Sequence, residues 1–301
     1  MDKSRQNSKK IYVGPAGWSY PDWRGTFYPA KANQRIDQLV FIAQYFNFVE
    51  INSSYYHPPS TDAAQTWCSR VAGNKDFRFT AKLWQKFILE RSTYTNKDIE
   101  SVQKAFDILF DAGLLGAILI QFPQSFQNKL DERSWLFRIL TIFKMYPLVV
   151  ELRHASWNVA QTFDLLKEMD AGFVNIDQPV VGKGIGFTEI ATSPTGYFRF
   201  HGRNKEMWFN ENAGRDDRYN YTYTKSELQT FLKAVKTADA QSETVYVVFN
   251  NHFKGQAVRN AFEFMYLLKN EKLDLPDSLI KTYPDLIEIR KSINPEQLEL
   301  F

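Results

Sequence analysis

Four histidines stand where a protein can use them for proton transfer. His57, His154, His201 and His252 each follow a short apolar stretch with the length and composition of a β-strand. Histidine changes charge near neutral pH, and reactive side chains that follow several strands are typical of sites at the carboxyl ends of parallel strands. A histidine after a strand is also often structural, so we expect about two of the four to be functional.

Charged side chains accompany these histidines within the strands. Neighbouring residues of a strand point to opposite faces. In the stretch from Tyr197 to His201 the two phenylalanines must face an outer layer, which turns Tyr197, Arg199 and His201 inward. The same alternation predicts inward positions for a further set of polar residues, namely Glu50, Asn52, Arg78, Thr80, Lys82, Glu151, Arg153, Asn175, Asp177 and one of Asn250 and Asn251.

The inward carboxylates and the histidine beside them are candidates for acid/base catalysis. The expected catalytic residues are Glu50, Glu151, Asp177 and His201. The cations Lys82, Arg153 and Arg199 must pair with carboxylates, because burying an unpaired ion costs several kcal/mol. Burial raises the pKa of a carboxyl and a nearby cation lowers it, and the sequence leaves open which effect wins. A purely structural ion network is the alternative.

The elements that position these residues alternate between strand and helix. Apolar runs that read as strands cover residues 11–16, 48–52, 77–82, 117–121, 148–153, 173–177, 197–201 and 245–251, with helix-period segments between most of them. This pattern predicts an α/β fold, a single (β/α)8 TIM-type barrel over residues 11–270. Glycine and proline in residues 179–194 predict a long loop and an irregular sixth βα unit. A basic arm, residues 1–10, precedes the barrel, and an extension, residues 271–301, follows it.

Two segments late in the chain predict a phosphate cradle. One is His201-Gly202-Arg203-Asn204 after the seventh strand, and the other runs from Asn250 to Gly255 at the start of the last barrel helix. Glycine lets the backbone approach a ligand, and a helix amino terminus offers free N–H groups. The expected ligands are Gly202, Arg203, Asn250, Asn251, His252, Lys254 and Gly255. Helix capping by Asn251 is the alternative.

Aromatic residues gather in the loops that follow the strands. These are Trp18, Tyr20 and Trp23 of the first loop, Tyr55, Tyr56 and His57 of the second, and Trp208 of the seventh. They predict a wall on which sugars or bases stack, and a lid over the barrel without any ligand is the alternative. Three further residues at strand ends complete the expected binding set, namely Asn52, Gln121 and His154.

The last five residues, Gln297 to Phe301, form a separate motif. The sequence Gln-Leu-Glu-Leu-Phe resembles the pentapeptide by which bacterial DNA polymerases and repair enzymes dock on the replication sliding clamp. In that interpretation Gln297, Leu298, Leu300 and Phe301 bind the clamp, with the Leu-Phe pair in an apolar pocket. The alternative is a terminal segment that packs on its own barrel.

Bulk composition excludes several classes of protein. The 37 Lys and Arg against 34 Asp and Glu give a net charge of only +3, too small to indicate nonspecific nucleic-acid binding. The single cysteine, Cys68, forms no internal disulfide, and residues 1–10 lack the apolar segment of a signal peptide, so we expect a cytoplasmic protein. No apolar stretch is long enough to span a membrane. No cofactor is predicted, and a divalent metal is a minor alternative because no short metal-ligand motif is present.

Several longer stretches resemble the YecE-like family, domain of unknown function 72. They are VGPAGWSYPDWRGTFYP, FVEINSSYYHPPS, FRFTAK, LGAILIQFPQSF, VVELRHASW, YFRFHGRN with Trp208, and VYVVFNNHFKGQAVRNA. The resemblance implies a TIM-type barrel and supplies no established reaction, so no catalytic residue is carried over from it. After FRFTAK the family usually has a Thr-His pair, whereas this chain has Leu83-Trp84-Gln85-Lys86. This departure weakens any metal site that would use the third loop.

These features together predict a barrel enzyme that binds a phosphate-bearing substrate, with nucleic acid as one candidate. We expect hydrolase-like acid/base chemistry at the strand carboxyl ends, with His201 and Glu151 transferring protons and Arg153, Arg203 and Lys82 stabilising negative charge. A second hypothesis is a non-catalytic accessory protein that is recruited to the sliding clamp. A third is a carbohydrate-active barrel with two carboxylates, which the surplus of inward cations disfavours.

Overall fold

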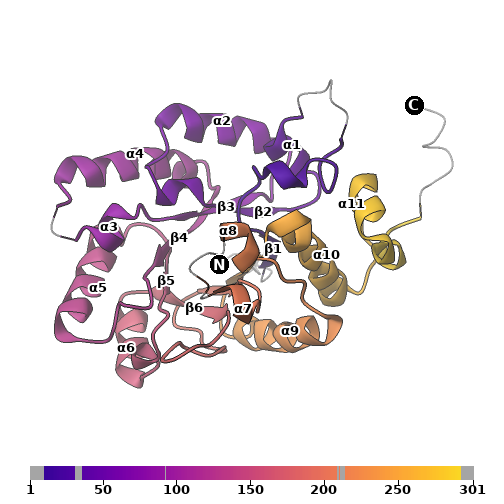
Figure 1. Ribbon diagram of the computed structural model, residues 1–301. Helices are drawn as coiled ribbons and strands as arrows, with labels where there is room; N and C mark the ends of the chain where they lie inside the picture. The colour runs from indigo at the N-terminus through magenta and orange to yellow at the C-terminus, as the bar shows by residue number, and fades with distance from the viewer. Residues whose placement is uncertain (1–9, 31–35, 92, 209, 211–213, 293–301) are drawn as a thin grey trace, which may run out of the picture.

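The computed structural model is a barrel of parallel strands surrounded by helices (Figure 1). It describes residues 10–30, 36–91, 93–208, 210 and 214–292. The eight strands are β1 Lys10–Pro15, β2 Phe48–Ile51, β3 Arg78–Lys82, β4 Leu115–Gln121, β5 Leu148–Glu151, β6 Ala171–Asp177, β7 Thr195–Phe200 and β8 Thr244–Phe249. The predicted (β/α)8 fold is confirmed.

Helices and short 3₁₀ turns connect the strands and cover the outside of the barrel (Figure 1). The helices are α1 Gln38–Ile42, α2 Thr61–Val71, α3 Lys86–Leu89, α4 Asn96–Asp111, α5 Leu130–Phe143, α6 Ala160–Glu168, α7 Lys205–Trp208, α8 Arg215–Arg218, α9 Lys225–Asp239, α10 Gln256–Lys269 and α11 Asp277–Thr282. The 3₁₀ turns are η1 Pro21–Trp23, η2 Ser53–Tyr55, η3 Ala155–Trp157, η4 Phe253–Gly255 and η5 Pro284–Ile289. None of the described helices is long and apolar enough to cross a membrane.

The barrel closes along one weakly paired seam. β1 pairs with β8 over its whole length, and pairing continues strand by strand round to β2. Between β1 and β2 only one bridge forms, from Ala16 to Glu50, where the N–H of Gly17 donates to the carbonyl of Glu50 at 2.8 Å. The backbone at the carboxyl end of β2 is therefore held by the first loop.

Aromatic rings fill the amino-terminal half of the barrel interior. Tyr246 lies between three of them, with ring centroids 5.2 Å from Tyr12, 5.0 Å from Phe48 and 5.9 Å from Tyr197. Barrel interiors are usually filled by branched aliphatic residues in layers. Here a tyrosine layer lies directly below the charged residues, and the hydroxyl of Tyr197 donates to Glu50 at 2.9 Å.

The predicted inward positions of Asn175 and Asp177 are wrong. In the parallel pairing of β6 with β7, Asn175 lies beside Phe198 and Asp177 beside Phe200. Both phenylalanines face the outside of the barrel, since Phe200 stacks on Phe231 of α9 at 4.1 Å and Phe198 lies 6.3 Å from Phe187 of the sixth loop. Every residue of β6 is buried, so alternation of polar and apolar residues does not identify its inner face. Instead, Asn175 fixes the irregular sixth loop, accepting hydrogen bonds from the hydroxyl of Thr188 at 2.7 Å and from the Ile190 N–H at 2.8 Å.

Another prediction about this part of the chain is confirmed. No helix forms between β6 and β7, as the glycines and prolines of residues 179–194 indicated. Thr224 and Glu227 cap α9 reciprocally, since the Glu227 N–H donates to Thr224 Oγ1 at 3.3 Å and the Thr224 N–H donates to Glu227 Oε2 at 2.8 Å. The extension packs on the barrel through α11 and η5, where Leu279 and Leu286 are buried.

The seam between β1 and β2 depends on a glycine. A Cβ added at Gly14 would lie 2.1 Å from the backbone carbonyl oxygen of Phe48. We therefore expect Gly14→Ala to lower the free energy of unfolding by about 1–3 kcal/mol or more, as overpacking in a core does. Urea unfolding monitored by tryptophan fluorescence measures the change. The matched control is Gly73→Ala, where nothing lies within 4 Å of the new methyl; an equal loss in both variants would contradict the explanation.

Candidate functional site

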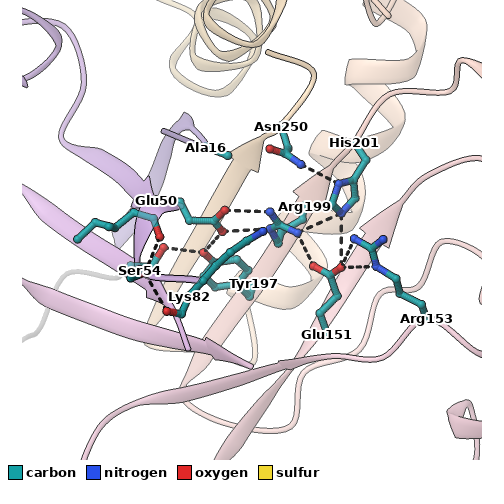
Figure 2. A network of polar contacts seen from close by, with 12 residues as sticks. Ala16, Glu50, Ser54, Lys82, Glu151, Arg153, Tyr197, Arg199, His201 and Asn250 are labelled. Atoms are coloured by element: carbon teal, nitrogen blue, oxygen red, sulfur yellow. Dashed lines mark hydrogen bonds and ion pairs between the residues drawn. The ribbon is translucent and has the colours of Figure 1, made fainter. Parts of the chain in front are cut away.

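The guanidinium of Arg199 ties two carboxylates together across the barrel (Figure 2). Its Nε and Nη2 donate to Glu50 of β2 at 3.0 and 2.8 Å, and its Nη1 donates to Glu151 of β5 at 2.5 Å. All three side chains are fully buried. Forked hydrogen bonds of this kind are the strong form of an ion pair. Three of the side chains predicted to face inward thus meet at one point.

Glu151 is held by a second arginine as well. Arg153 Nε donates to Glu151 Oε1 at 2.7 Å, on the side away from Arg199. Burial raises the pKa of Glu151, but the guanidiniums of Arg199 and Arg153 outweigh burial and hold that pKa well below its usual range. The side chain therefore stays ionised. This settles the question that the sequence left open, and it argues against Glu151 as a proton donor.

His201 lies in the same cluster and is sealed from solvent (Figure 2). Its Nε2 is 3.2 Å from Arg199 Nη1 and 3.6 Å from Glu151 Oε1, and its Nδ1 faces the side-chain amide of Asn250 at 2.9 Å. Burial and the charge of Arg199 lower the pKa of His201 to about 3. The imidazole is therefore uncharged at neutral pH and is a poor general acid there.

Lys82, at the end of β3, is the cation of the cluster that lacks a carboxylate partner. Its ammonium makes no hydrogen bond or ion pair with any residue that the structure describes, and it lies 5.4 Å from the ring centre of Tyr55. The side chain reaches toward Arg199 and Glu50 (Figure 2). Burial and the charge of Arg199 lower the pKa of Lys82 to about 8, against the opposing effect of Glu50 and Glu151.

A small pocket opens above this cluster at the carboxyl end of the barrel. Its volume is about 100 Å³, enough for several water molecules. The lining residues are Tyr20, Asn52, Tyr55, Tyr56, Lys82, Tyr219, Asn250 and His252. They come from the end of β3 and from the loops after β1, β2, β7 and β8, which is the arrangement that the strand-end histidines and aromatic loops predicted. A larger cavity of about 320 Å³ lies on the outer surface between α9, α10 and η5, away from the strand ends.

Aromatic residues form one wall of the pocket, with different roles for individual rings. His252 stacks on Tyr20 with ring centroids 4.5 Å apart and also contacts Tyr219 at 5.1 Å. Trp23 is buried beneath them and donates from its indole nitrogen to the carbonyl of His252 at 2.8 Å. Trp208 packs on Tyr219 at 5.5 Å and lies 6.1 Å from His201.

Some predicted binding residues lie outside the pocket. Trp18 packs against Trp67 and Phe79 instead of lining it. His57 is exposed, and Gln121, at the end of β4, has a buried side-chain oxygen without a hydrogen-bond partner among the described residues. His154 has a structural role, because its Nδ1 accepts from the backbone N–H of Ser156 at 3.1 Å and thereby caps η3.

The predicted phosphate cradle is already occupied by protein groups. The N–H of Gly202 donates to the Tyr223 hydroxyl at 2.7 Å, and the N–H of Lys254 donates to Asp22 at 2.6 Å. The N–H of Gly255 donates to the carbonyl of His252. Since these donors have partners, the segments after β7 and β8 do not form the free anion cradle that the sequence indicated. The Asn251 side chain donates to the Tyr221 carbonyl and to Asn260, so it does not cap the helix either.

Asp177 and Arg203 form a separate ion pair outside the barrel interior. Arg203 donates to both oxygens of Asp177 at 2.7 to 3.0 Å and to Glu227 at 2.9 Å, and the hydroxyl of Tyr223 donates to Asp177 at 2.7 Å. Asp177 therefore does not join the other three predicted catalytic residues. The pair fastens the seventh loop to the start of α9.

Sequence reasoning missed Tyr219, which lines the pocket and packs on both His252 and Trp208. It lies in the long segment after β7, and neither strand alternation nor helix periodicity identified it. Among the described residues, no group of three or more His, Cys, Asp and Glu side chains is arranged to hold a metal ion. The terminal peptide Gln297 to Phe301 lies outside the described residues, and its docking role stays a prediction.

The buried imidazole of His201 makes the free energy of unfolding depend on pH below neutrality. The native state keeps His201 unprotonated down to pH about 3, whereas the unfolded chain binds a proton below about pH 6.5. The contribution of the neutral His201 side chain to the free energy of unfolding is therefore fully present above pH 6.5 and is lost as the pH falls. We expect the free energy of unfolding to fall by about 1 kcal/mol per unit between pH 6 and 5 because of this group. In His201→Gln, urea titrations should show a free energy of unfolding that changes less steeply with pH, by the same amount. Identical slopes in the wild type and the variant would show that His201 is protonated in the native state.

Comparisons with known proteins agree with this geometry. The chain matches the family model described as "Protein of unknown function DUF72" over residues 12–283. It is 28% identical over 278 residues to the UPF0759 protein YunF of Bacillus subtilis (strain 168), covering 87% of this chain and 95% of YunF. It is similar in structure to a DUF72 family protein of Thermotoga maritima, at 32% identity and a TM-score of 0.76 over 86% of this chain and 99% of that one. A DUF72 family protein of Enterococcus faecalis gives 26% identity and a TM-score of 0.77 over 88% of this chain and 97% of that one. The chain therefore belongs to the DUF72 family, whose description assigns it no reaction.

Proposed function

We propose that this protein is an enzyme that binds a phosphate-bearing substrate in the pocket at the mouth of the barrel and carries out acid/base chemistry there. The observation that carries the proposal is the charge of the buried cluster. Lys82, Arg153 and Arg199 supply three positive charges, Glu50 and Glu151 supply two negative ones, and His201 is uncharged. One positive charge is left over beneath the pocket.

An unpaired buried cation is costly, and an anionic ligand would remove that cost. Arg153 is the arginine of the cluster that reaches solvent, with 16% of its side chain exposed. The pocket adds hydroxyl and amide groups that donate hydrogen bonds to phosphate oxygens, among them those of Tyr55, Tyr219 and Asn250. We infer that the phosphate binds between these donors and the side of the cluster on which Arg153 reaches solvent.

Lys82 is the residue best suited to transfer protons in this pocket. A catalytic acid or base works best when its pKa is near the pH of the reaction. The pKa of Lys82, lowered to about 8 chiefly by burial, leaves both of its forms populated near neutral pH. His201 and Glu151, the candidates taken from the sequence, both have a pKa far below that range. In this proposal they hold Arg199 in place and do not exchange protons with the substrate.

The same charges disfavour a carbohydrate-active barrel. Glycosidases of the usual type need one carboxylic acid that stays protonated until it reaches the substrate. The guanidiniums of Arg199 and Arg153 hold the pKa of Glu151 well below its usual range, so Glu151 stays ionised. Both oxygens of Glu50 already accept hydrogen bonds from Arg199 or Tyr197. Acid/base chemistry on an anionic substrate therefore fits the cluster better than hydrolysis by a carboxylate pair.

Two lysines offer a matched test of where the anion binds. We expect inorganic phosphate and 2-phosphoglycolate, titrated calorimetrically at low salt, to bind the wild type and to bind Lys82→Met about tenfold or more weakly. The variant loses the surplus positive charge of the cluster, and a unit charge about 8 Å from the phosphate contributes roughly 2 kcal/mol at an effective dielectric constant of about 20. Lys254→Met is the control, because Lys254 is exposed and its Nζ lies over the ring of Phe253. Loss of phosphate binding in Lys254→Met alone would support the phosphate site predicted after β8. Equal phosphate binding by the wild type, Lys82→Met and Lys254→Met would contradict the proposal.

A further inference from the structure

We propose that Lys82 forms an imine with the carbonyl carbon of its substrate, so that the substrate class is a small aldehyde or ketone that carries a phosphate group. The phosphate part of this inference rests on the proposed function above. The imine part rests on the geometry of Lys82 itself: an unpaired amine, on a rigid strand end, that lines the pocket.

The carboxylates near Lys82 already accept hydrogen bonds from other donors. The two oxygens of Glu50 accept from Arg199 and Tyr197, and the two oxygens of Glu151 accept from Arg199 and Arg153. None of these hydrogen bonds comes from the Lys82 amine, which lies over the ring of Tyr55 and has no hydrogen-bond or ion-pair partner among the described residues. Lys86, four residues further on, pairs with Asp98 at 3.1 Å.

The backbone holds Lys82 firmly in position. The Lys82 carbonyl accepts from the hydroxyl of Ser54 at 2.8 Å (Figure 2), and the next N–H, of Leu83, donates to Leu119 at 2.9 Å. Lys82 is the last residue of β3, and its inward direction is set by pairing with β2 and β4. A nucleophile fixed on a strand end is better oriented than one on a loop.

The surroundings also make the amine nucleophilic. Only the neutral form of an amine attacks a carbonyl, and desolvation or a neighbouring cation increases its population. With its pKa lowered to about 8 by burial and by Arg199, about a quarter of Lys82 is neutral at pH 7.5. For an ordinary lysine the neutral fraction at that pH is about a thousandth.

The covalent step balances without any oxidant or reductant. Nζ of the neutral amine forms a C–N bond with the carbonyl carbon while the π electrons of the C=O bond move to oxygen. Transfer of a proton from nitrogen to that oxygen gives a carbinolamine. A second proton on the oxygen lets it leave as water, and the nitrogen lone pair forms the C=N bond. The hydroxyls of Tyr55 and Tyr219, which line the pocket, are placed to pass these protons.

The product keeps the charge of the cluster unchanged. A protonated imine carries one positive charge, as the ammonium did, so the surplus charge beneath the pocket persists after the bond forms. The phosphate of the substrate is therefore held in the same way before and after the covalent step. Imine formation and anion binding are compatible in one pocket.

Borohydride trapping with a small phosphorylated aldehyde tests this inference. The full-length protein is incubated with glycolaldehyde phosphate at pH 7.5, reduced with sodium borohydride, and mapped by peptide mass spectrometry. We expect one predominant secondary-amine adduct on Lys82, formed with a pH dependence centred near 8, and no adduct at that position in Lys82→Met. Lys86→Met is the matched control and should be labelled like the wild type, because Lys86 pairs with Asp98.

The outcomes separate the imine from the phosphate site. Labelling spread over exposed lysines without preference for Lys82 overturns the imine, and if phosphate still binds calorimetrically the proposed function stands. Labelling of Lys82 that is at least tenfold stronger with glycolaldehyde phosphate than with glycolaldehyde supports both. Equal labelling of Lys82 by the two aldehydes supports the imine and contradicts the phosphate site. Peptide mapping of the wild type gives the answer even when Lys82→Met does not fold.

Discussion

The ion pairs of one buried arginine determine what the rest of this barrel can do. Arg199 connects Glu50 of β2 to Glu151 of β5, and none of the three side chains reaches solvent. Taking three charges out of water is costly, and removal of one partner would leave an uncompensated ion in the core. The guanidiniums of Arg199 and Arg153 hold the pKa of Glu151 well below its usual range, so this carboxylate stays ionised. Glu50 and Glu151 accept hydrogen bonds from donors other than Lys82, and among the described residues the Lys82 ammonium has no hydrogen-bond or ion-pair partner. The reactivity proposed for Lys82 depends on this arrangement.

A core built in this way is not the most stable way to fill a barrel. Replacing a buried ion network with aliphatic residues of similar volume is often neutral or stabilising, and the layer below the network shows that this chain packs rings well, with Tyr246 in contact with Tyr12 and Phe48. The network of Arg199, Glu50 and Glu151 lies at the carboxyl end of the barrel, beneath the pocket. This position is the one that the proposed role toward a ligand requires.

Sequence patterns identified the barrel and most of the residues at its centre. Where a prediction from these patterns was wrong, the structure gives a physical reason. The phenylalanines on either side of Arg199 identified the inner face of β7, because Phe198 and Phe200 both pack outside the barrel. β6 is buried on both faces, so alternation placed Asp177 on the wrong one. The phosphate cradle failed because its N–H groups find partners distant in sequence, such as Asp22 for Lys254. The protonation of Glu151 needed the two arginine distances, which no spacing in the sequence supplies.

The two proposed roles of the pocket also constrain how a substrate lies in it. A phosphate directly on the Lys82 amine would raise the pKa of that amine and remove the neutral form that attacks a carbonyl. The phosphate must therefore bind toward the partly exposed Arg153, which is always charged, with the carbonyl carbon at Lys82. This orientation of the substrate follows because arginine stays charged near neutral pH, whereas Lys82 changes its charge there. Lys82 lines the pocket and the Arg153 side chain is 16% exposed, so in this proposal charge recognition and nucleophilic attack fall to different residues.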